Sequence, residues 1–293
     1  MLLGDWERIF KTAYNRSMKK IYGIIGDPVA HSLSPVMHNA AFKKLGMDAI
    51  YLAFRVSPEE VGDAIRGAKS LGIAGLNVTI PLKEKALSFV DAEEVAKKIG
   101  AVNTIDFSSG TPAGYNTDGI GSLRILKEVV GEINGKNVLI LGAGGAAKAI
   151  SFYLDAEGAR VTIANRTREK AAQLVSKLRN ADFISLGVEL EKRIEDSNIL
   201  INATSVGMHP NEDATLVNAY LMHPDLVVFD IVYNPLETKL LREAKRAGVK
   251  KIVDGVKMLV YQGAASFKIW TKKEPPIETM ENAVRDALSH GSS

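Results

Sequence analysis

Short apolar runs alternate with stretches of helical periodicity along most of this chain. In the first half, apolar runs predict strands at 21–26, 49–56 and 76–80, and helical patterns begin near Pro35 and Pro58. Strands that alternate with helices are typical of parallel βαβ units, because each helix carries the chain back to the start of the next strand. The first half is therefore predicted to form an α/β domain.

Two further apolar runs close the first half. Residues 101–107 and 113–116 flank Ser-Ser-Gly-Thr-Pro at 108–112, a composition that favours a tight turn. We expect these runs to form a hairpin added to the first sheet. A helical stretch over 120–130 then leads to Gly135, after which a new alternation begins.

The second half repeats the alternation with a longer series of strands. They are predicted at 138–141, 161–163, 183–186, 199–202, 227–231 and 251–253. Such a series with intervening helices matches a doubly wound parallel sheet, whose ligand lies across the carboxyl ends of the strands where the topology switches. Two helical stretches, 258–270 and 276–288, follow this sheet.

Composition narrows the class of protein. A chain of 293 residues with 46% hydrophobic and 24% charged residues has the make-up of a globular protein long enough for two domains. No apolar run approaches the length of a membrane span, so no membrane partner is expected. The absence of cysteine excludes disulfides and thiolate chemistry and fits a cytoplasmic protein. The net charge of +3 comes from interspersed charges, so nucleic-acid binding is not expected.

Residues 1–17 stand apart from this pattern. Trp6, Phe10 and Tyr14 recur there at helical spacing, but charges interrupt them. The segment is either an amphipathic helix docked on the body or an extension without function, because Met18-Lys19-Lys20 resembles a natural start.

A glycine-rich turn follows the first strand of the second series. It reads Gly142-Ala143-Gly144-Gly145-Ala146, between an apolar strand and an alanine-rich helix. Small residues there let the backbone approach a pyrophosphate, and the helix N-terminus offers free N–H groups. The turn predicts a dinucleotide site, although glycine turns also connect strands to helices for steric reasons alone.

The end of the next strand predicts which dinucleotide is bound. It reads Asn165-Arg166-Thr167, where a carboxylate would accept from a ribose 2'-hydroxyl and repel a 2'-phosphate. Donors and a positive charge instead favour NADP(H) over NAD(H). In the alternative interpretation, Arg166 is a solvated charge at the start of a helix that Thr167 caps.

Polar residues of the first half lie where a buried parallel strand should be apolar. Strand periodicity places Asn77 and Thr79 on one face, so either a polar ligand or ordinary hydrogen bonding must satisfy them. Ser32 and Ser34 precede Pro35, which predicts Ser34 as a helix N-cap. Two hydroxyls beside a helix N-terminus also make a suitable site for a carboxylate.

Two charged residues complete the set of candidates. Asp118 closes the segment 114–119 and could be the N-cap of the following helix, and Lys83 follows the strand of Asn77. By spacing alone, each charge is more often a surface group than a catalyst. Asn103 lies on the strand before Asp118.

These segments together closely resemble the shikimate dehydrogenase family, NADP-dependent enzymes of aromatic amino acid biosynthesis. The resemblance extends from residue 21 to about residue 270. Its motifs are Ser32-x-Ser34, 77–83, 101–104, 114–119, the Gly142 turn, Asn165-Arg166-Thr167, 202–205, Asp230-x-x-Tyr233-x-Pro235 and Gly255-x-x-Met258-Leu259-x-x-Gln262. The resemblance implies a substrate-binding domain of 18–119 with 258–293 and a Rossmann-type NADP domain of 120–257. It also implies that the C-terminal helices return to the first domain.

The resemblance also assigns roles to residues of this sequence. It implies that Ser32 and Ser34 hold the substrate carboxylate with Tyr233 nearby, and that Lys83 works beside Asp118. The ring hydroxyls would be bound by Asn77, Thr79, Asn103, Asp118 and Gln262. The cofactor residues would be Gly142, Ala143, Gly144, Gly145, Ala146, Asn165, Arg166, Thr167, Lys170, Thr204, Ser205, Ile231 and Gly255, with Glu94 as a further candidate. Lys170 stands where many relatives have arginine, and no metal is implied.

The activity that the resemblance implies is the reversible reduction of 3-dehydroshikimate to shikimate. Lys83 is the best proton donor to the carbonyl oxygen, although the sequence leaves open whether Lys83 or Asp118 moves the proton. The alternatives are a quinate/shikimate dehydrogenase of the same family and a non-catalytic NADP(H)-sensing module. The sequence leaves a monomer or a homodimer open.

Overall fold

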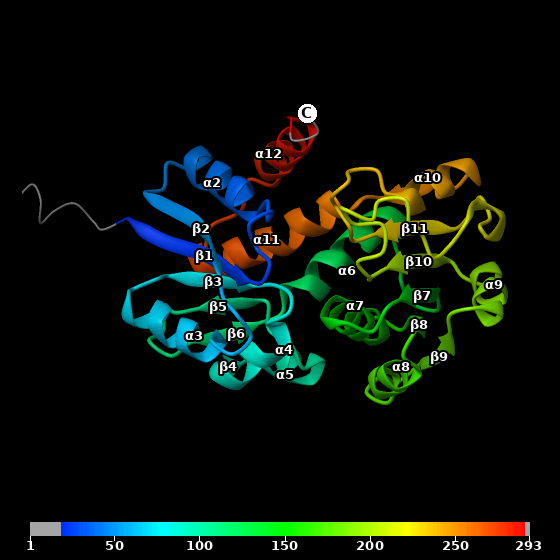
Figure 1. Ribbon diagram of the computed structural model, residues 1–293, viewed down its shortest axis with the longest axis horizontal. Coiled ribbons are helices and arrows are strands. Elements are labelled where there is room, and N and C mark those ends of the chain that lie inside the picture. The colour runs from blue at the N-terminus through cyan, green and yellow to red at the C-terminus, as the bar shows by residue number, and fades with distance from the viewer. Residues whose placement is uncertain (1–18, 291–293) are drawn as a thin grey trace, which may run out of the picture.

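The structure, a computed structural model, describes residues 19–290, so the prediction for residues 1–17 lies outside the described residues. Two six-stranded sheets organise the chain, one from each half (Figure 1). The first half forms β1 (Lys20–Gly26), α2 (Ser34–Lys44), β2 (Ala49–Arg55), α3 (Val61–Ser70), β3 (Gly75–Val78), α4 (Lys83–Ala86), a 3-10 turn (Leu87–Phe89), β4 (Asp91–Ala92), α5 (Glu94–Ile99), β5 (Thr104–Asp106) and β6 (Ala113–Tyr115).

The first sheet is mixed, in the order β2-β1-β3-β5-β6-β4. Strands β1, β2 and β3 are parallel, as their alternation with helices predicts, and β5 and β6 form the expected antiparallel hairpin. The structure differs from the prediction at β3, which ends at Val78. Thr79 therefore lies beyond the strand, where its N–H donates to Ile25 O at 2.9 Å.

The second half forms the predicted doubly wound sheet. Its elements are α6 (Thr117–Val130), β7 (Asn137–Leu141), α7 (Gly145–Ala156), β8 (Arg160–Asn165), α8 (Arg168–Val175), β9 (Ala181–Ser185), α9 (Val188–Glu195), β10 (Ile199–Asn202), a 3-10 turn (Ala219–Leu221), β11 (Val227–Asp230), α10 (Lys239–Arg246) and β12 (Lys251–Val253). All strands are parallel, in the order β12-β11-β10-β7-β8-β9. The topology therefore switches between β7 and β10, directly beside the glycine-rich turn that follows β7.

Strand composition explains why this sheet is covered on both faces. Residues 138–141 of β7 are apolar and all are buried. Val138 and Ile140 belong to one core cluster, and Leu139 and Leu141 belong to another. A strand that is apolar at every position must bury both faces, which the helices on each side of the sheet provide.

Two long helices follow the second sheet and pack against the first half of the chain. Helix α11 (Gly255–Thr271) runs from the second sheet back to the first and crosses α6, and α12 (Ile277–His290) packs against α2 (Figure 1). Glycine permits the crossing, because a Cβ atom on Gly121 would lie 2.8 Å from the backbone nitrogen of Gln262. Residues 19–290 contain no helix with the length and apolar character of a membrane span.

Candidate active site

The loop after β1 brings two serines to the start of α2. The expected N-cap at Ser34 is wrong: α2 begins with Ser34 as its first helical residue, after Leu33. The physical reason is the hydroxyl of Ser32, which accepts the Ser34 N–H at 3.3 Å, so the helix starts one residue earlier. Ser34 is buried and Ser32 is half-buried.

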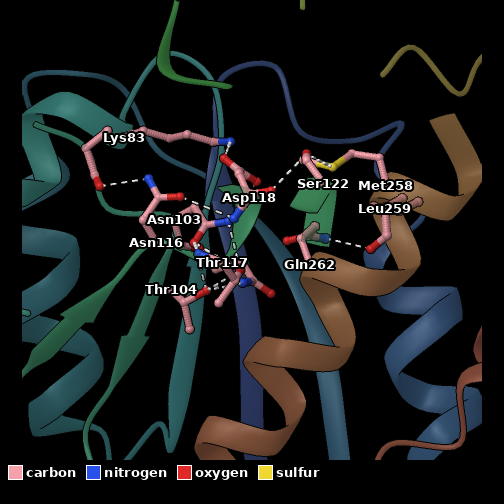
Figure 2. A network of polar contacts seen from close by, with 12 residues as sticks. Lys83, Asn103, Thr104, Asn116, Thr117, Asp118, Ser122, Met258, Leu259 and Gln262 are labelled. Carbon is pink, nitrogen blue, oxygen red and sulfur yellow. Dashed lines mark hydrogen bonds and ion pairs between the residues drawn. The ribbon is translucent and has the colours of Figure 1, made fainter. Parts of the chain in front are cut away.

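Lys83 and Asp118 form an ion pair at the meeting point of α4 and α6. Lys83 Nζ lies 2.5 Å from Asp118 Oδ2, and the side chains are 17% and 6% exposed (Figure 2). Asn103 Nδ2 donates to the other carboxylate oxygen at 2.8 Å. Asp118 is not the N-cap of α6, because Asn116 has that place and its side chain accepts the Asp118 N–H. Spacing alone could not place these two charges together, since they come from separate elements, whereas the family resemblance implied that Lys83 lies beside Asp118.

The same lysine lies beside the glycine-rich turn. A Cβ atom on Gly145 would lie 3.6 Å from Lys83 Cδ. Next to Lys83, the carboxylate of Glu84 pairs with Lys148 of α7 at 2.6 Å. Helix α4 of the first half therefore lies against the start of α7, with the Lys83 ammonium between the two sheets.

Asn77 and Asn103 are both buried and bonded within the protein. Asn77 Oδ1 accepts from the Tyr51 hydroxyl at 2.7 Å, and its amino group faces Thr104 and Ser266. Asn103 Nδ2 also donates to Thr117 Oγ1 at 3.0 Å. Hydrogen bonds within the protein therefore use most of the donors and acceptors of these two amide side chains.

The three remaining substrate candidates are half-buried and come from different elements. Thr79 follows β3, and Gln262 lies on α11, where its amide donates to Leu259 O at 2.8 Å (Figure 2). Tyr233 follows β11 but packs against the core that α2 and α11 share, and burial raises the pKa of its hydroxyl. Tyr233 therefore connects the cofactor sheet to the first half of the chain.

The glycine-rich turn requires glycine at its first position. Gly142 has φ +108°, and a Cβ atom there would lie 2.9 Å from both Ala203 O and Thr204 Cγ2. At Gly144, the N-cap of α7, a Cβ atom would meet open space. The turn therefore leaves room for a ligand at the N-terminus of α7, while Thr204 packs directly behind Gly142.

A cavity of about 540 Å³ opens beside this turn. Its wall includes the predicted residues Ala143, Gly144, Asn165, Arg166, Thr167 and Lys170. Throughout the described part of the chain, no ion pair involves Arg166 or Lys170, so their charges remain available to an anion. Thr167 is the N-cap residue of α8, but its side chain makes no capping hydrogen bond. Asn165 Nδ2 donates to the backbone oxygen of Thr167 at 2.8 Å.

Sequence reasoning missed four charged residues in this wall. They are Glu84, Lys98, Lys148 and Lys177. Glu84 and Lys98 come from the first half of the chain, so no local motif could have predicted them beside the cofactor turn. The candidate Glu94 does not line the cavity; its carboxylate pairs with Lys98 at 3.4 Å.

A buried carboxyl group ties together the loops that carry the other cofactor candidates. Asp230 accepts from Asn202, the Val232 N–H and the Thr238 hydroxyl, and burial raises its pKa to about 6. Asn202 in turn accepts from the hydroxyl of Thr204, which precedes Ser205, at 2.6 Å. Ile231 follows Asp230 directly. Its carbonyl oxygen would lie 2.7 Å from a Cβ atom on Gly255, so glycine is needed at the start of α11.

The fold and the site define a class of protein. A doubly wound sheet with a glycine turn at its switch point, and a buried lysine–carboxylate pair beside that turn, are features of a dinucleotide-dependent oxidoreductase. Family models agree: the shikimate dehydrogenase substrate binding domain matches residues 24–105, shikimate / quinate 5-dehydrogenase matches 124–239, and the shikimate 5'-dehydrogenase C-terminal domain matches 255–285.

Relatives and solved structures match over nearly the whole chain. A shikimate dehydrogenase (NADP(+)) of Methanococcoides burtonii is 55% identical over 92% of this chain and 99% of its own. A crystal structure of a shikimate dehydrogenase in complex with NADP+ superposes with TM-score 0.88 at 47% identity, over 92% of this chain and 96% of that one. The Thermus thermophilus enzyme in complex with NADP(H) and shikimate gives TM-score 0.84 at 38% identity, over 92% and 100%. The chain belongs to the shikimate dehydrogenase family, and the expected family and fold class are confirmed.

Proposed function

We propose that this protein is an NADP-dependent shikimate dehydrogenase that catalyses the reversible reduction of 3-dehydroshikimate to shikimate. The observation that carries the proposal is the buried Lys83–Asp118 pair, at 2.5 Å, beside Gly145 of the glycine-rich turn. This arrangement places a proton donor next to the cofactor turn. The relatives' shared name, shikimate dehydrogenase (NADP(+)), supports both the substrate and the cofactor.

The cofactor residues fit NADP(H) better than NAD(H). Arg166 and Lys170 line the cavity without a carboxylate partner, and positions 164–167 hold no acidic side chain. A 2'-phosphate would gain charge-assisted hydrogen bonds from Arg166, whereas a 2'-hydroxyl would lack the carboxylate that usually accepts from it. The open space at Gly144 and the N-terminus of α7 suit the pyrophosphate.

The substrate residues offer groups that match a small hydroxylated ring acid. The Ser32 and Ser34 hydroxyls at the start of α2 would hold the carboxylate, with the Tyr233 hydroxyl as a further donor. Asn77, Thr79, Asn103 and Gln262 would bind the ring hydroxyls. These roles are our proposal, supported by the family motifs and by the burial of these side chains around the first sheet.

The contacts of Asp118 favour Lys83 as the group that moves the proton. Bound NADPH would supply the hydride. Asp118 accepts from Asn103 through Oδ1 and from Lys83 through Oδ2, so both of its oxygens serve as acceptors. The Lys83 ammonium would stabilise the developing oxyanion and then protonate it at Nζ, and neutral Lys83 would act as the base in the reverse direction.

Steady-state assays with shikimate and quinate, each with NADP+ and NAD+, test this function. We expect shikimate with NADP+ to give the highest kcat/KM, measured by the absorbance of the reduced cofactor. A preference for quinate with NAD+ would identify a quinate/shikimate dehydrogenase instead. Cofactor binding without turnover of either acid would identify a sensing module.

Two further proposals concern the location of the enzyme in the cell and its oligomeric state. We place it in the cytoplasm, because a chain without cysteine suits a reducing compartment. A homodimer is a separate proposal. Light scattering tests it by measuring the mass in solution.

A further inference from the structure

A cluster of polar side chains is buried between α11 and the first sheet. Its members are Tyr51, Asn77, Asn103, Thr104, Thr117 and Ser266, and each is at most 4% exposed. Burying polar groups without hydrogen bonds costs free energy, whereas an apolar filling would carry no such cost. The cluster is hydrogen-bonded throughout, so it defines the orientations of its members.

The orientation of the Asn77 amide follows from its neighbours. Its Nδ2 atom lies 3.1 Å from Asn103 O, a backbone carbonyl that can only accept a hydrogen bond. The same nitrogen lies 3.1 Å from Thr104 Oγ1 and 3.0 Å from Ser266 Oγ, so these acceptors use both of its hydrogens. The polar capacity left for a ligand is a lone pair on Oδ1. Asn77 can therefore recognise a group that donates, such as a ring hydroxyl.

Ser266 holds the amide from the side of α11. Its hydroxyl donates to Gln262 O one turn earlier, at 3.1 Å, which leaves the oxygen lone pairs to accept from Asn77 Nδ2. The same oxygen lies 2.8 Å from Thr104 Oγ1. Ser266 therefore fixes α11, and with it the substrate candidate Gln262, relative to Asn77.

Tyr51 holds the amide from the opposite side. Its hydroxyl donates to Asn77 Oδ1 at 2.7 Å. Burial raises the pKa of this hydroxyl, and the side chain of Ser34 acts in the opposite direction, which places Ser34 near it. Its ring stacks on His38, with centroids 4.4 Å apart and planes inclined by 10°. Tyr51 thus links the proposed carboxylate site at Ser34 to the proposed ring site at Asn77.

We propose that Tyr51 and Ser266 are positioning residues for the substrate, acting through the amide of Asn77. Together they keep Asn77 Oδ1 as an acceptor for a substrate hydroxyl. This inference rests on the proposed function, because it assigns the ring hydroxyls of shikimate to that site.

Two variants and two matched controls test the inference. Tyr51→Phe and Ser266→Ala each remove one hydroxyl from the cluster. Tyr22→Phe is the control for the first, because Tyr22 lies in the same core with its ring against Phe42 and Trp270. Ser151→Ala is the control for the second, because this buried serine of α7 donates to the carbonyl of Lys148 in its own helix.

We expect each test variant to raise the KM for shikimate about fivefold, the effect of one net hydrogen bond, with kcat and the KM for NADP+ within about twofold of wild type. The controls should leave all three constants unchanged. In an Asn77→Ala background, the same substitutions should change the KM for shikimate by less than about twofold, because the amide through which they act is gone.

The outcomes separate the inference from the proposed function. If the wild type oxidises shikimate but the test variants behave like their controls, the inference is overturned and the function stands. A loss that persists in the Asn77→Ala background also overturns it, because the hydroxyls would then act by another route. A wild type that does not oxidise shikimate contradicts the proposed function, and the inference fails with it.

Discussion

The carboxyl group of Asp230 makes stability depend on pH in a direction that can be worked out. It is fully buried at the end of β11, and burial raises its pKa from 3.8 to about 6. Hydrogen bonds from Thr238, Val232 and Asn202 lower the pKa but do not offset the desolvation. The ionised group is therefore less stable in the folded protein than in the unfolded chain.

The magnitude follows from the two pKa values. Between about pH 3.8 and about pH 6, the folded protein binds more protons at Asp230 than the unfolded chain does. The contribution of Asp230 to stability is therefore present at low pH and is lost as the pH rises. One pKa unit corresponds to ~1.4 kcal/mol, so the whole change is about 3 kcal/mol. About half of it, ~1.4 kcal/mol, falls between about pH 5 and about pH 7.5.

Asp230→Asn removes this titration while keeping the hydrogen bonds. The amide oxygen can still accept from Val232 and Asn202, and the amino group can donate to the hydroxyl oxygen of Thr238. The assay is urea unfolding of wild type and variant near pH 7.5 and near pH 5. The quantity compared is the free energy of unfolding of the variant minus that of the wild type. This difference should be about 1.4 kcal/mol lower near pH 5 than near pH 7.5, because only the wild type is stabilised as the pH falls. A difference that is the same at both pH values would refute the reasoning.

Three further predictions address separate parts of the structure. Arg166→Ala should raise the KM for NADP+ by roughly 10- to 100-fold and leave the KM for NAD+ nearly unchanged. An equal rise in the KM for both cofactors would contradict a role in binding the 2'-phosphate. Arg168→Ala is the control, because the guanidinium of this neighbouring arginine stacks on Phe183. Gly142→Ala should destabilise the protein by about 2 kcal/mol in thermal unfolding and weaken both cofactors alike, because of its φ and the contact with Ala203 O. Burial lowers the pKa of His38 to about 3, so the folded protein binds fewer protons at this group than the unfolded chain does below about pH 6.5. By itself, this group should lower the free energy of unfolding by about 2 kcal/mol between about pH 7.5 and about pH 5. His38→Leu should abolish that loss, and a variant with the wild-type pH dependence would show that His38 is not its source.

The alternation of apolar runs with helical patterns was sufficient to predict most of the fold, because the strands are short and apolar. The doubly wound sheet could be predicted from its alternation, and the glycine turn after β7 marked its switch point. Strand β4 was missed, because two residues carry no periodicity. The end of β3 was also misplaced, since Thr79 continues the alternation although its backbone leaves the sheet.

The candidate site was predictable where local sequence carries the chemistry. Asn165-Arg166-Thr167 reaches the cavity as a single segment, so its place beside the glycine-rich turn could be predicted from a few residues, while its role in cofactor binding stays a prediction. Lys98 and Lys148 reach the same cavity from elements far apart in the chain, and only the packing of α5 against α7 brings them there. Tyr51 and Ser266 gave no signal either, because a lone tyrosine in an apolar strand or a serine in a helix usually has no partner of this kind.

The most direct test of the central claim, that Lys83 beside Asp118 transfers the proton, is the rate of NADP+ reduction by shikimate in wild type and Lys83→Ala. Circular dichroism would first establish that the variant is folded, because the substitution leaves the carboxylate of Asp118 without its cation. We predict that kcat falls by roughly 10² to 10⁴, while the KM for shikimate changes much less. A folded Lys83→Ala variant with near-normal turnover would contradict the claim and remove Lys83 from the chemistry.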